Sequence, residues 1–110
     1  GGDREIFRYG GEEFAVVLDG VSPEHALHVA ERLRQTVEQL GIPHPGSPAG
    51  HVTISLGVAA VAVLTPETLP RLLETADSAL YSAKEHGRNR VHLAGELVKK
   101  SACLAAGDRL

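Results

Sequence analysis

The sequence predicts a single α/β domain, and three observations predict it. Two long segments carry apolar residues at helical spacing. Other short segments are rich in β-branched residues, which is typical of strands. Finally, 110 residues can bury one hydrophobic core but lack the bulk for two.

The first elements are two short strands joined by a glycine turn. The stretch "EEFAVVLD", residues 12–19, is typical of a buried strand, and a shorter extended piece precedes it at residues 5–9. Gly10 and Gly11 between them can supply the positive φ angles of a tight hairpin turn. The side chains of Glu12 and Glu13 are therefore expected at a hairpin corner.

The first helix follows the second strand. Ser22 and Pro23 suit an N-cap and a first helical position, and Gly41 ends the periodic run. The apolar residues between them recur at helical spacing: Ala26, Ala30, Leu33, Val37 and Leu40. Residues 41–50, "GIPHPGSPAG", contain three prolines and three glycines and are expected to form a loop.

The second half repeats the alternation of strand and helix. From Val52 the stretch "VTISLGVAAV" alternates apolar with small or polar residues, as a strand does. Thr65 and Pro66 are expected to open a second helix that Gly87 closes, and a short strand is expected at about Arg90 to Leu93. The apolar stripe of that helix is Leu69, Leu72, Leu73, Ala76, Leu80 and Ala83.

Composition excludes several classes of protein. The net charge of −3 argues against a general nucleic-acid binder, although it leaves room for a small anionic ligand. No apolar run is long enough to cross a bilayer, and the first residues do not resemble a secretion signal. Cys103 is the only cysteine, which suits a reducing compartment. We therefore expect a cytoplasmic location.

Two groups of charged residues suggest chemistry. Adjacent carboxylates at Glu12 and Glu13 repel, so they are either well solvated or stabilised by a divalent cation, which favours carboxylate and phosphate oxygens. Lys84, Arg88 and Arg90 cluster around Gly87, together with Asn89. Such cations either complement the helix dipole or grip phosphate oxygens.

Three separated blocks of the sequence resemble the diguanylate cyclase, or GGDEF-domain, family. The blocks are "RYGGEEF", "VTISLGVA" and "ADSALYSAKEHGRNRV", in the family's order and at about its spacing, over residues 8–93. The resemblance implies a ferredoxin-like domain of the palm type found in nucleotide cyclases, with an antiparallel sheet and helices on one face. It also implies the substrate GTP and the product cyclic di-GMP.

The resemblance assigns roles to particular residues. Gly10 and Gly11 would let the backbone approach GTP, and Glu12 and Glu13 would hold Mg²⁺ or Mn²⁺ and help deprotonate the attacking ribose hydroxyl. Lys84 and Arg88 match positions that contact phosphates. Each domain binds one GTP, so a homodimer of two facing domains is required.

The chain departs from the family at its start. The family has a core strand with a metal-binding aspartate, and then helices, before the hairpin, whereas only nine residues precede Gly10 here. Asp3 is too close to the turn to be that aspartate. We therefore expect residues 1–93 to form a truncated domain that is inactive alone. The alternative is a non-catalytic module that binds GTP or cyclic di-GMP, or that signals by association.

Product inhibition and the C-terminal tail are the remaining questions. Gly1 and Arg4 occupy the positions of the family's Arg-x-x-Asp inhibitory motif, so that site is expected to be absent. Arg32 matches an arginine that can contact inhibitory product on a partner domain, although it also suits a solvated helix face. Residues 94–110 lie beyond the resemblance, and a short helix is expected at about Glu96 to Ala105.

Removing the first strand of a ferredoxin-like sheet has a structural consequence. That strand is central and lies between the last strand and the second strand of the hairpin. Without it, two strand edges would be left unpaired inside the domain. We expect the chain either to exchange strands with another copy or to fill the gap with one of its own segments.

Overall fold

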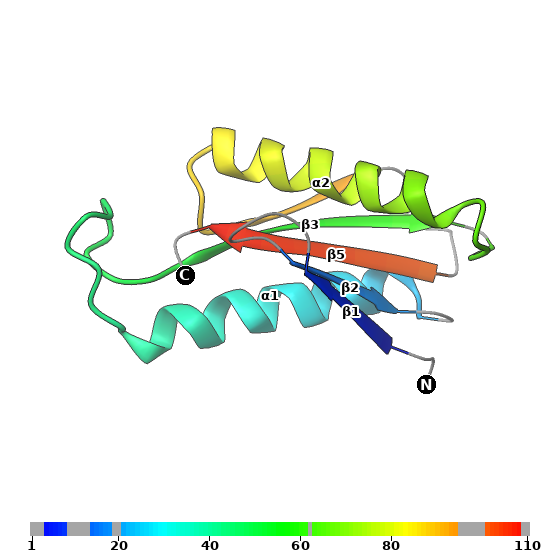
Figure 1. The fold of residues 1–110 in the computed structure, drawn as a ribbon. Coiled ribbons are helices and arrows are strands. Elements are labelled where there is room, and N and C mark those ends of the chain that lie inside the picture. The colour runs from blue at the N-terminus through cyan, green and yellow to red at the C-terminus, as the bar shows by residue number, and fades with distance from the viewer. Residues whose placement is uncertain (1–3, 9–13, 19–20, 62, 95–100, 109–110) are drawn as a thin grey trace.

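A computed structural model describes residues 4–8, 14–18, 21–61, 63–94 and 101–108, and in these it shows an α/β fold (Figure 1). The predicted class is therefore confirmed. The elements in chain order are β1 (Arg4–Arg8), β2 (Phe14–Leu18), α1 (Pro23–Leu40), β3 (Ile54–Val61), α2 (Leu69–Glu85), β4 (Val91–Ala94) and β5 (Ser101–Asp108).

The five strands form one sheet in the order β1-β2-β5-β3-β4. Three neighbouring pairs are antiparallel, whereas β3 and β4 are parallel. The sheet is therefore mixed, and the expectation of an antiparallel sheet holds only for part of it. The reason is the connection: α2 carries the chain back along the sheet between β3 and β4, so both strands start from the same end.

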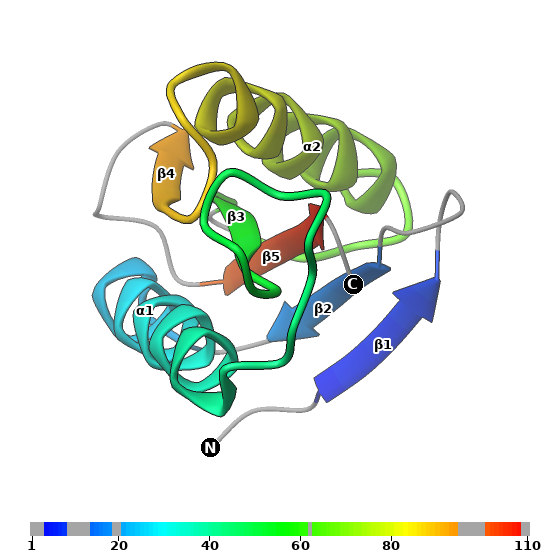
Figure 2. The same ribbon diagram turned by 90° about the vertical axis from the view of Figure 1, so that its left-hand side faces the viewer.

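The two helices cover opposite faces of the sheet, as the view along the sheet shows (Figure 2). The expectation of helices on one face is therefore wrong. The physical reason lies in β3, whose side chains are buried on both faces from Ile54 to Ala59. A strand that is buried on both sides needs a covering layer on each.

The face under α1 holds the larger aliphatic side chains. Ala26 and Ala30 of α1 are fully buried against Leu56 and Val58 of β3. Ala106 of β5 belongs to the same cluster and is only 4% exposed. The predicted apolar stripe of the first helix is therefore confirmed at its small residues, which let the helix lie close to the sheet.

The close packing of α2 on the sheet depends on Gly57 of β3. A Cβ placed on Gly57 would lie 2.2 Å from the backbone nitrogen of Leu80 and 2.3 Å from the carbonyl oxygen of Ala76. The backbone of α2 therefore touches the backbone of β3 at this point. Ala59 continues the same small-residue face two positions further along the strand.

The gap expected inside the sheet is filled by the chain's own C-terminal segment. β2 and β3 do not pair with each other, and β5 lies between them and pairs antiparallel with both. The helix expected at about Glu96 to Ala105 is therefore wrong for residues 101–105. A helix of about ten residues is only marginally stable by itself, so the pairing of N–H and C=O groups along two open strand edges outweighs it.

The ends of the helices follow from local hydrogen bonds. Ser22 caps α1 by accepting a hydrogen bond from the His25 N–H at 3.2 Å, as predicted. The second helix begins at Leu69 rather than at Thr65. Each of Thr65 and Thr68 accepts, on its hydroxyl, a hydrogen bond from the other's backbone N–H, and this holds residues 65–68 in a turn before the helix.

We predict that Gly57→Ala destabilises the domain, because its methyl group would meet the backbone of α2, which cannot move aside as a flexible side chain can. Overpacking of this kind typically costs about 1–3 kcal/mol and occasionally more. Urea unfolding followed by circular dichroism measures it. Gly46→Ala is the matched control, since a Cβ there meets only the His44 ring at 3.9 Å. Equal stability of the two variants would contradict the close approach of α2.

Candidate functional site at one end of the sheet

The strand register brings the strand ends that adjoin the two groups of predicted site residues to the same end of the sheet. One row of paired residues runs across all five strands: Arg8, Phe14, Ala106, Leu56 and Val91. The hairpin segment 9–13 joins Arg8 to Phe14, and the turn after α2 leads into Val91. Three strand spacings separate Phe14 from Val91, or about 14 Å.

Four of the predicted site residues belong to the hairpin segment. Gly10, Gly11, Glu12 and Glu13 lie outside the described residues, so their predicted roles remain predictions. What the structure establishes is the frame around them. The strands that flank them are paired, and Glu13 is covalently joined to Phe14 at this end of the sheet.

The two predicted phosphate-binding cations lie at the C-terminal end of α2. Lys84 is in the last turn of the helix, Arg88 follows Gly87, and both side chains are half-buried. The backbone of this turn is unusual. Gly87, Arg88 and Asn89 have φ angles of 124°, 61° and 48° in succession.

A positive φ at arginine is uncommon and costs roughly 1 kcal/mol. Strained backbone persists only where its surroundings hold it, and it is concentrated at functional sites. Here the Arg88 N–H donates to the Ala83 carbonyl at 3.0 Å, which closes the helix end. This bond holds the strained backbone of Arg88 at the end of α2.

Asn89 anchors this turn to the rest of the domain. Its backbone N–H donates to the hydroxyl of Ser55, a fully buried residue of β3, at 3.1 Å. Its side-chain amide donates to Glu38 at 2.6 Å and accepts from the Arg34 guanidinium at 3.0 Å. Asn89 therefore connects residues 84–90, called the cationic turn below, to β3 and to α1.

Charges on α1 complete this network. Arg34 is paired with Glu31 and, at 3.2 Å, with Glu38. The hydrogen bond from Asn89, followed by the charge of Arg34, lowers the pKa of the Glu38 carboxyl. The hydrogen bond from Arg34 lowers the pKa of Glu31. Both carboxylates are thus held in the charged form that anchors the turn.

Two histidines lie on the other side of the turn. The rings of His86 and His92 are 5.2 Å apart, and the Ser82 hydroxyl lies 3.0 Å from Nδ1 of His92. Burial lowers the pKa of His92, and the nearby His86 and Arg90 lower it further. This side of the turn therefore disfavours an additional positive charge.

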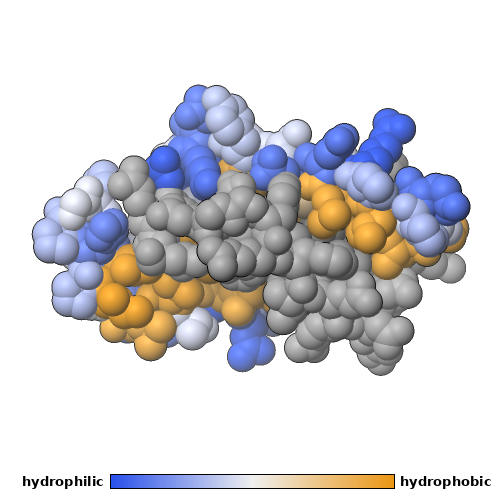
Figure 3. All heavy atoms as spheres, in the orientation of Figure 1, coloured by the Kyte–Doolittle hydropathy of each residue, from blue (hydrophilic) through white to orange (hydrophobic). Residues whose placement is uncertain are grey.

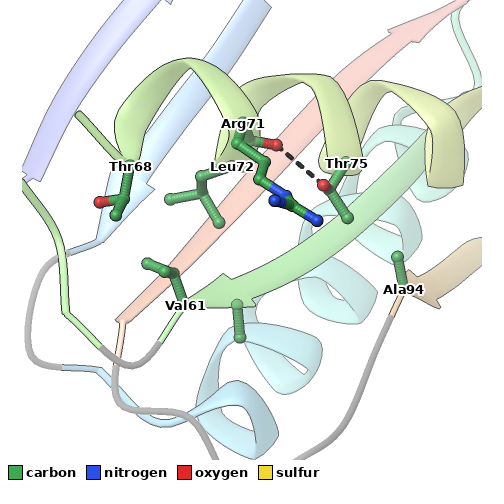
Figure 4. Close-up of a pocket in the computed structure, with 7 residues that line it drawn as sticks. Val61, Thr68, Arg71, Leu72, Thr75 and Ala94 are labelled. Atoms are coloured by element: carbon green, nitrogen blue, oxygen red, sulfur yellow. Dashed lines mark hydrogen bonds between the residues drawn. The ribbon is translucent and has the colours of Figure 1, made fainter. Parts of the chain in front are cut away.

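A small cavity adjoins the cationic turn, whereas a larger one lies elsewhere. The smaller, about 150 Å³, is lined by Ser47, Pro48, Ala49, Thr53, Gly87, Arg88 and Asn89. The larger, about 250 Å³, lies between the start of α2 and the opposite ends of β3 and β4, with Arg71 and Thr75 on its wall (Figure 4). The smaller cavity is assigned to the candidate site because Gly87, Arg88 and Asn89 line it.

Among the described residues, no group of three or more histidine, cysteine or acidic side chains could hold a metal ion. The register nevertheless places one carboxylate-bearing residue at this end that sequence reasoning missed. Asp108 ends β5, pairs with Ile54 of β3, and lies two residues beyond Ala106 in the direction of the hairpin segment. Nothing in the sequence signalled it, because the tail was expected to lie outside the domain.

The remaining predicted residue, Arg32, lies on the exposed surface of α1, apart from the cationic turn after α2.

Apolar atoms also reach the surface over α1, where Leu33 and Leu40 are 42% and 63% exposed (Figure 3). In the part of the chain that the structure describes, neither helix is both long and apolar enough to span a membrane.

Comparison with known proteins agrees with the resemblance of the sequence blocks. The family model "Diguanylate cyclase, GGDEF domain" matches residues 3–90. Diguanylate cyclase A of Treponema denticola is 44% identical over 94 residues, which are 86% of this chain and 25% of that protein. Diguanylate cyclase DosC of Escherichia coli is 40% identical over 88 residues, which are 80% of this chain and 19% of that protein. The chain thus spans about a quarter or less of the length of these relatives.

We predict that acid weakens the anchor of the cationic turn. Glu31 and Glu38 have folded-state pKa values below their usual 4.5, so the stability they contribute is present above that pH and is lost as the pH falls through the folded values. Arg34→Gln should therefore lose less stability between pH 6 and pH 3 than the unaltered chain does. Thermal unfolding at both pH values measures the difference.

Arg71→Gln is the control for general charge effects, since Arg71 is exposed at the far end of α2. It should keep the pH dependence of the unaltered chain. The same pH dependence in Arg34→Gln would show that the ion pairs do not hold the turn.

Proposed function

This chain belongs to the diguanylate cyclase GGDEF-domain family, and we propose from that premise that the complete domain condenses two GTP molecules into cyclic di-GMP with Mg²⁺ or Mn²⁺. One observation carries the proposal. The strand register brings Phe14, which follows Glu12 and Glu13 in the chain, and Val91, which follows the turn with Arg88, to the same end of one sheet.

The cationic turn would hold the triphosphate. Arg88 presents a planar guanidinium suited to two phosphate oxygens, and Lys84 adds a compact charge one helical turn earlier. Arg88 also lines the small cavity beside the turn. Because Asn89 fixes the turn to β3 and α1, the cations need little reorganisation when the ligand binds.

The hairpin would supply the carboxylates. Glu12 and Glu13 carry the hard oxygen donors that Mg²⁺ prefers together with phosphate oxygens, so the residue types fit the ion. When bound, the ion neutralises phosphate charge and makes a nearby hydroxyl more acidic. Gly10 and Gly11 would leave room for the nucleotide, since neither carries a Cβ.

The reaction that these residues would support is a transfer between two bound nucleotides. A carboxylate accepts the proton of one ribose 3′-hydroxyl, whose oxygen forms a bond to the α-phosphorus of the other GTP while pyrophosphate leaves. Repetition on the second nucleotide closes the ring. Each domain offers one such site, so two domains must face each other as a homodimer, and catalysis consists mainly of positioning and charge neutralisation.

The 110-residue chain by itself is proposed to be inactive. In the family, the central strand carries the metal-binding aspartate, and here β5 takes the place between β2 and β3. The alternative function, a non-catalytic GTP or cyclic di-GMP binding module, gains support from the same observation. A cyclase and a binding module would both bind nucleotide, but only the cyclase would form cyclic di-GMP.

We predict that the chain binds GTP more tightly with Mg²⁺ than without it and forms no cyclic di-GMP. Calorimetric titration measures the first, and chromatography of the products measures the second. Replacing both carboxylates, Glu12→Ala with Glu13→Ala, should abolish the Mg²⁺ dependence and leave the metal-free affinity nearly unchanged, because only the ion's ligands are lost.

An unchanged Mg²⁺ dependence in the double variant would refute the metal assignment. Detectable turnover would refute the inactivity of the chain. In that event Asp108→Asn becomes decisive, since Asp108 is the carboxylate that the register brings to this end of the sheet.

We also predict that the cations serve the phosphates rather than the base. Lys84→Ala and Arg88→Asn should each weaken GTP binding about tenfold or more and leave guanosine binding unchanged, as expected for charge-assisted bonds. Asparagine is chosen at position 88 because it tolerates a positive φ. Arg71→Ala is the matched cation control and should bind GTP normally. Equal losses of GTP and guanosine binding would indicate a folding defect instead.

A further inference from the structure

The place of β5 in the sheet is a slot that any suitable strand could occupy. β5 pairs with five residues of β2 on one side and with eight residues of β3 on the other. These ladders are formed by main-chain groups, so they do not depend on which chain provides the strand. An empty slot would expose two strand edges, and open edges recruit other strands.

The slot requires small residues, and the tail provides them. On the α2 face of the sheet, the register places Cys103, Ala105 and Gly107 directly opposite Ala59, Gly57 and Ser55. This is the face on which α2 lies against the backbone of β3 at Gly57. On the other face, Ala106 is buried against α1. In this register, small residues of β5 are thus paired with small residues of β3.

Two features make β5 separable from the rest of the domain. It is rich in alanine, glycine and serine, which form strands poorly, so the neighbouring ladders hold it rather than its own preference. It is also separated in the sheet from β4, the strand that precedes it in the chain, because β3 lies between the two.

We propose that β5 exchanges between two copies of this chain, so that the tail of each copy fills the slot between β2 and β3 of the other. Exchange of an identical element is a low-cost route to a dimer, because every bond of the closed monomer is formed again. This inference concerns assembly and stands independently of the proposed function.

The geometry fixes which ends of the two copies would meet. β4 ends at Ala94 and β5 starts at Ser101, both at the end of the sheet opposite the hairpin and the cationic turn. Six residues can span about 20 Å, so the partner must lie close to that end. The exchanged dimer would therefore direct the two candidate sites away from each other, unlike the facing arrangement that condensation requires.

The test uses Cys103, the only cysteine of the chain. An acceptor chain carries Ala59→Cys with Cys103→Ala, and the donor is the unaltered chain with an affinity tag. Position 59 is paired directly with residue 103, and directly opposed residues have the Cα separation that a disulfide needs. When the donor tail occupies the acceptor slot, residues 59 and 103 are directly opposed, so the mixed disulfide should form in preference to non-specific oxidation.

The chains are mixed over a range of concentrations in mild urea, diluted, and oxidised briefly. We expect a mixed disulfide whose yield rises with the total concentration during mixing. The control acceptor carries Ala60→Cys with Cys103→Ala, since residue 60 pairs with residue 102 and faces the other side of the sheet. Ala60 is more exposed than Ala59, so non-specific oxidation would favour the control.

The single variant Ala59→Cys in the unaltered tail background supplies the reference. Its disulfide should form within one chain at high dilution. If the single variant forms its intrachain disulfide but no mixed disulfide appears, the exchange is overturned. Equal yields of mixed disulfide from the two acceptors would also overturn it. So would a single variant that forms no intrachain disulfide, because the tail would then not occupy the slot in this register. If Ala59→Cys fails to fold, Val17→Cys with Cys103→Ala serves as acceptor from β2, because residue 17 also pairs with residue 103.

Discussion

The continuity of the sheet depends on the pairing of β5 with two neighbours at once. β1 and β2 form one antiparallel pair and β3 and β4 form a separate parallel pair, and only β5 connects them. Without that connection, the main-chain groups of β2 and β3 that face the slot would have no protein partner. The hairpin and the cationic turn would then belong to two different bodies. The alignment on which the candidate site rests is thus a consequence of a strand from the C-terminal tail.

Within the second body, the close packing of α2 on β3 determines where the cations lie. Gly57 lets the helix backbone rest on the strand, and this contact fixes the height and direction of α2. The chain then turns back through three residues with positive φ angles before β4 begins. Asn89 offsets the strain of that turn with bonds to β3 and to α1. The packing of α2 on β3 and the strained turn that follows α2 together determine where the backbone of Arg88 lies.

The chain matches the family over most of its length, but its central strand comes from outside the matched residues. The family match covers most of the chain, and the residues at the hairpin and the turn have the types that nucleotide and metal binding require. The central strand, however, is supplied by a segment that lies beyond the matched residues. The well-anchored turn therefore lies in a sheet whose central strand comes from outside the matched segment.

The sequence by itself determined the fold class, both helices and the first four strands. These features are local: a capping serine, an apolar stripe or a glycine turn acts on its near neighbours in the chain. Only the tertiary structure decided that the helices lie on opposite faces, that Asn89 joins three elements, and that the tail becomes a strand ending at Asp108. A short tail forms only a marginal helix by itself, so the two unpaired edges beside it decide its conformation. These edges belong to strands that are distant from the tail in the sequence, so no window of neighbouring residues contains the signal.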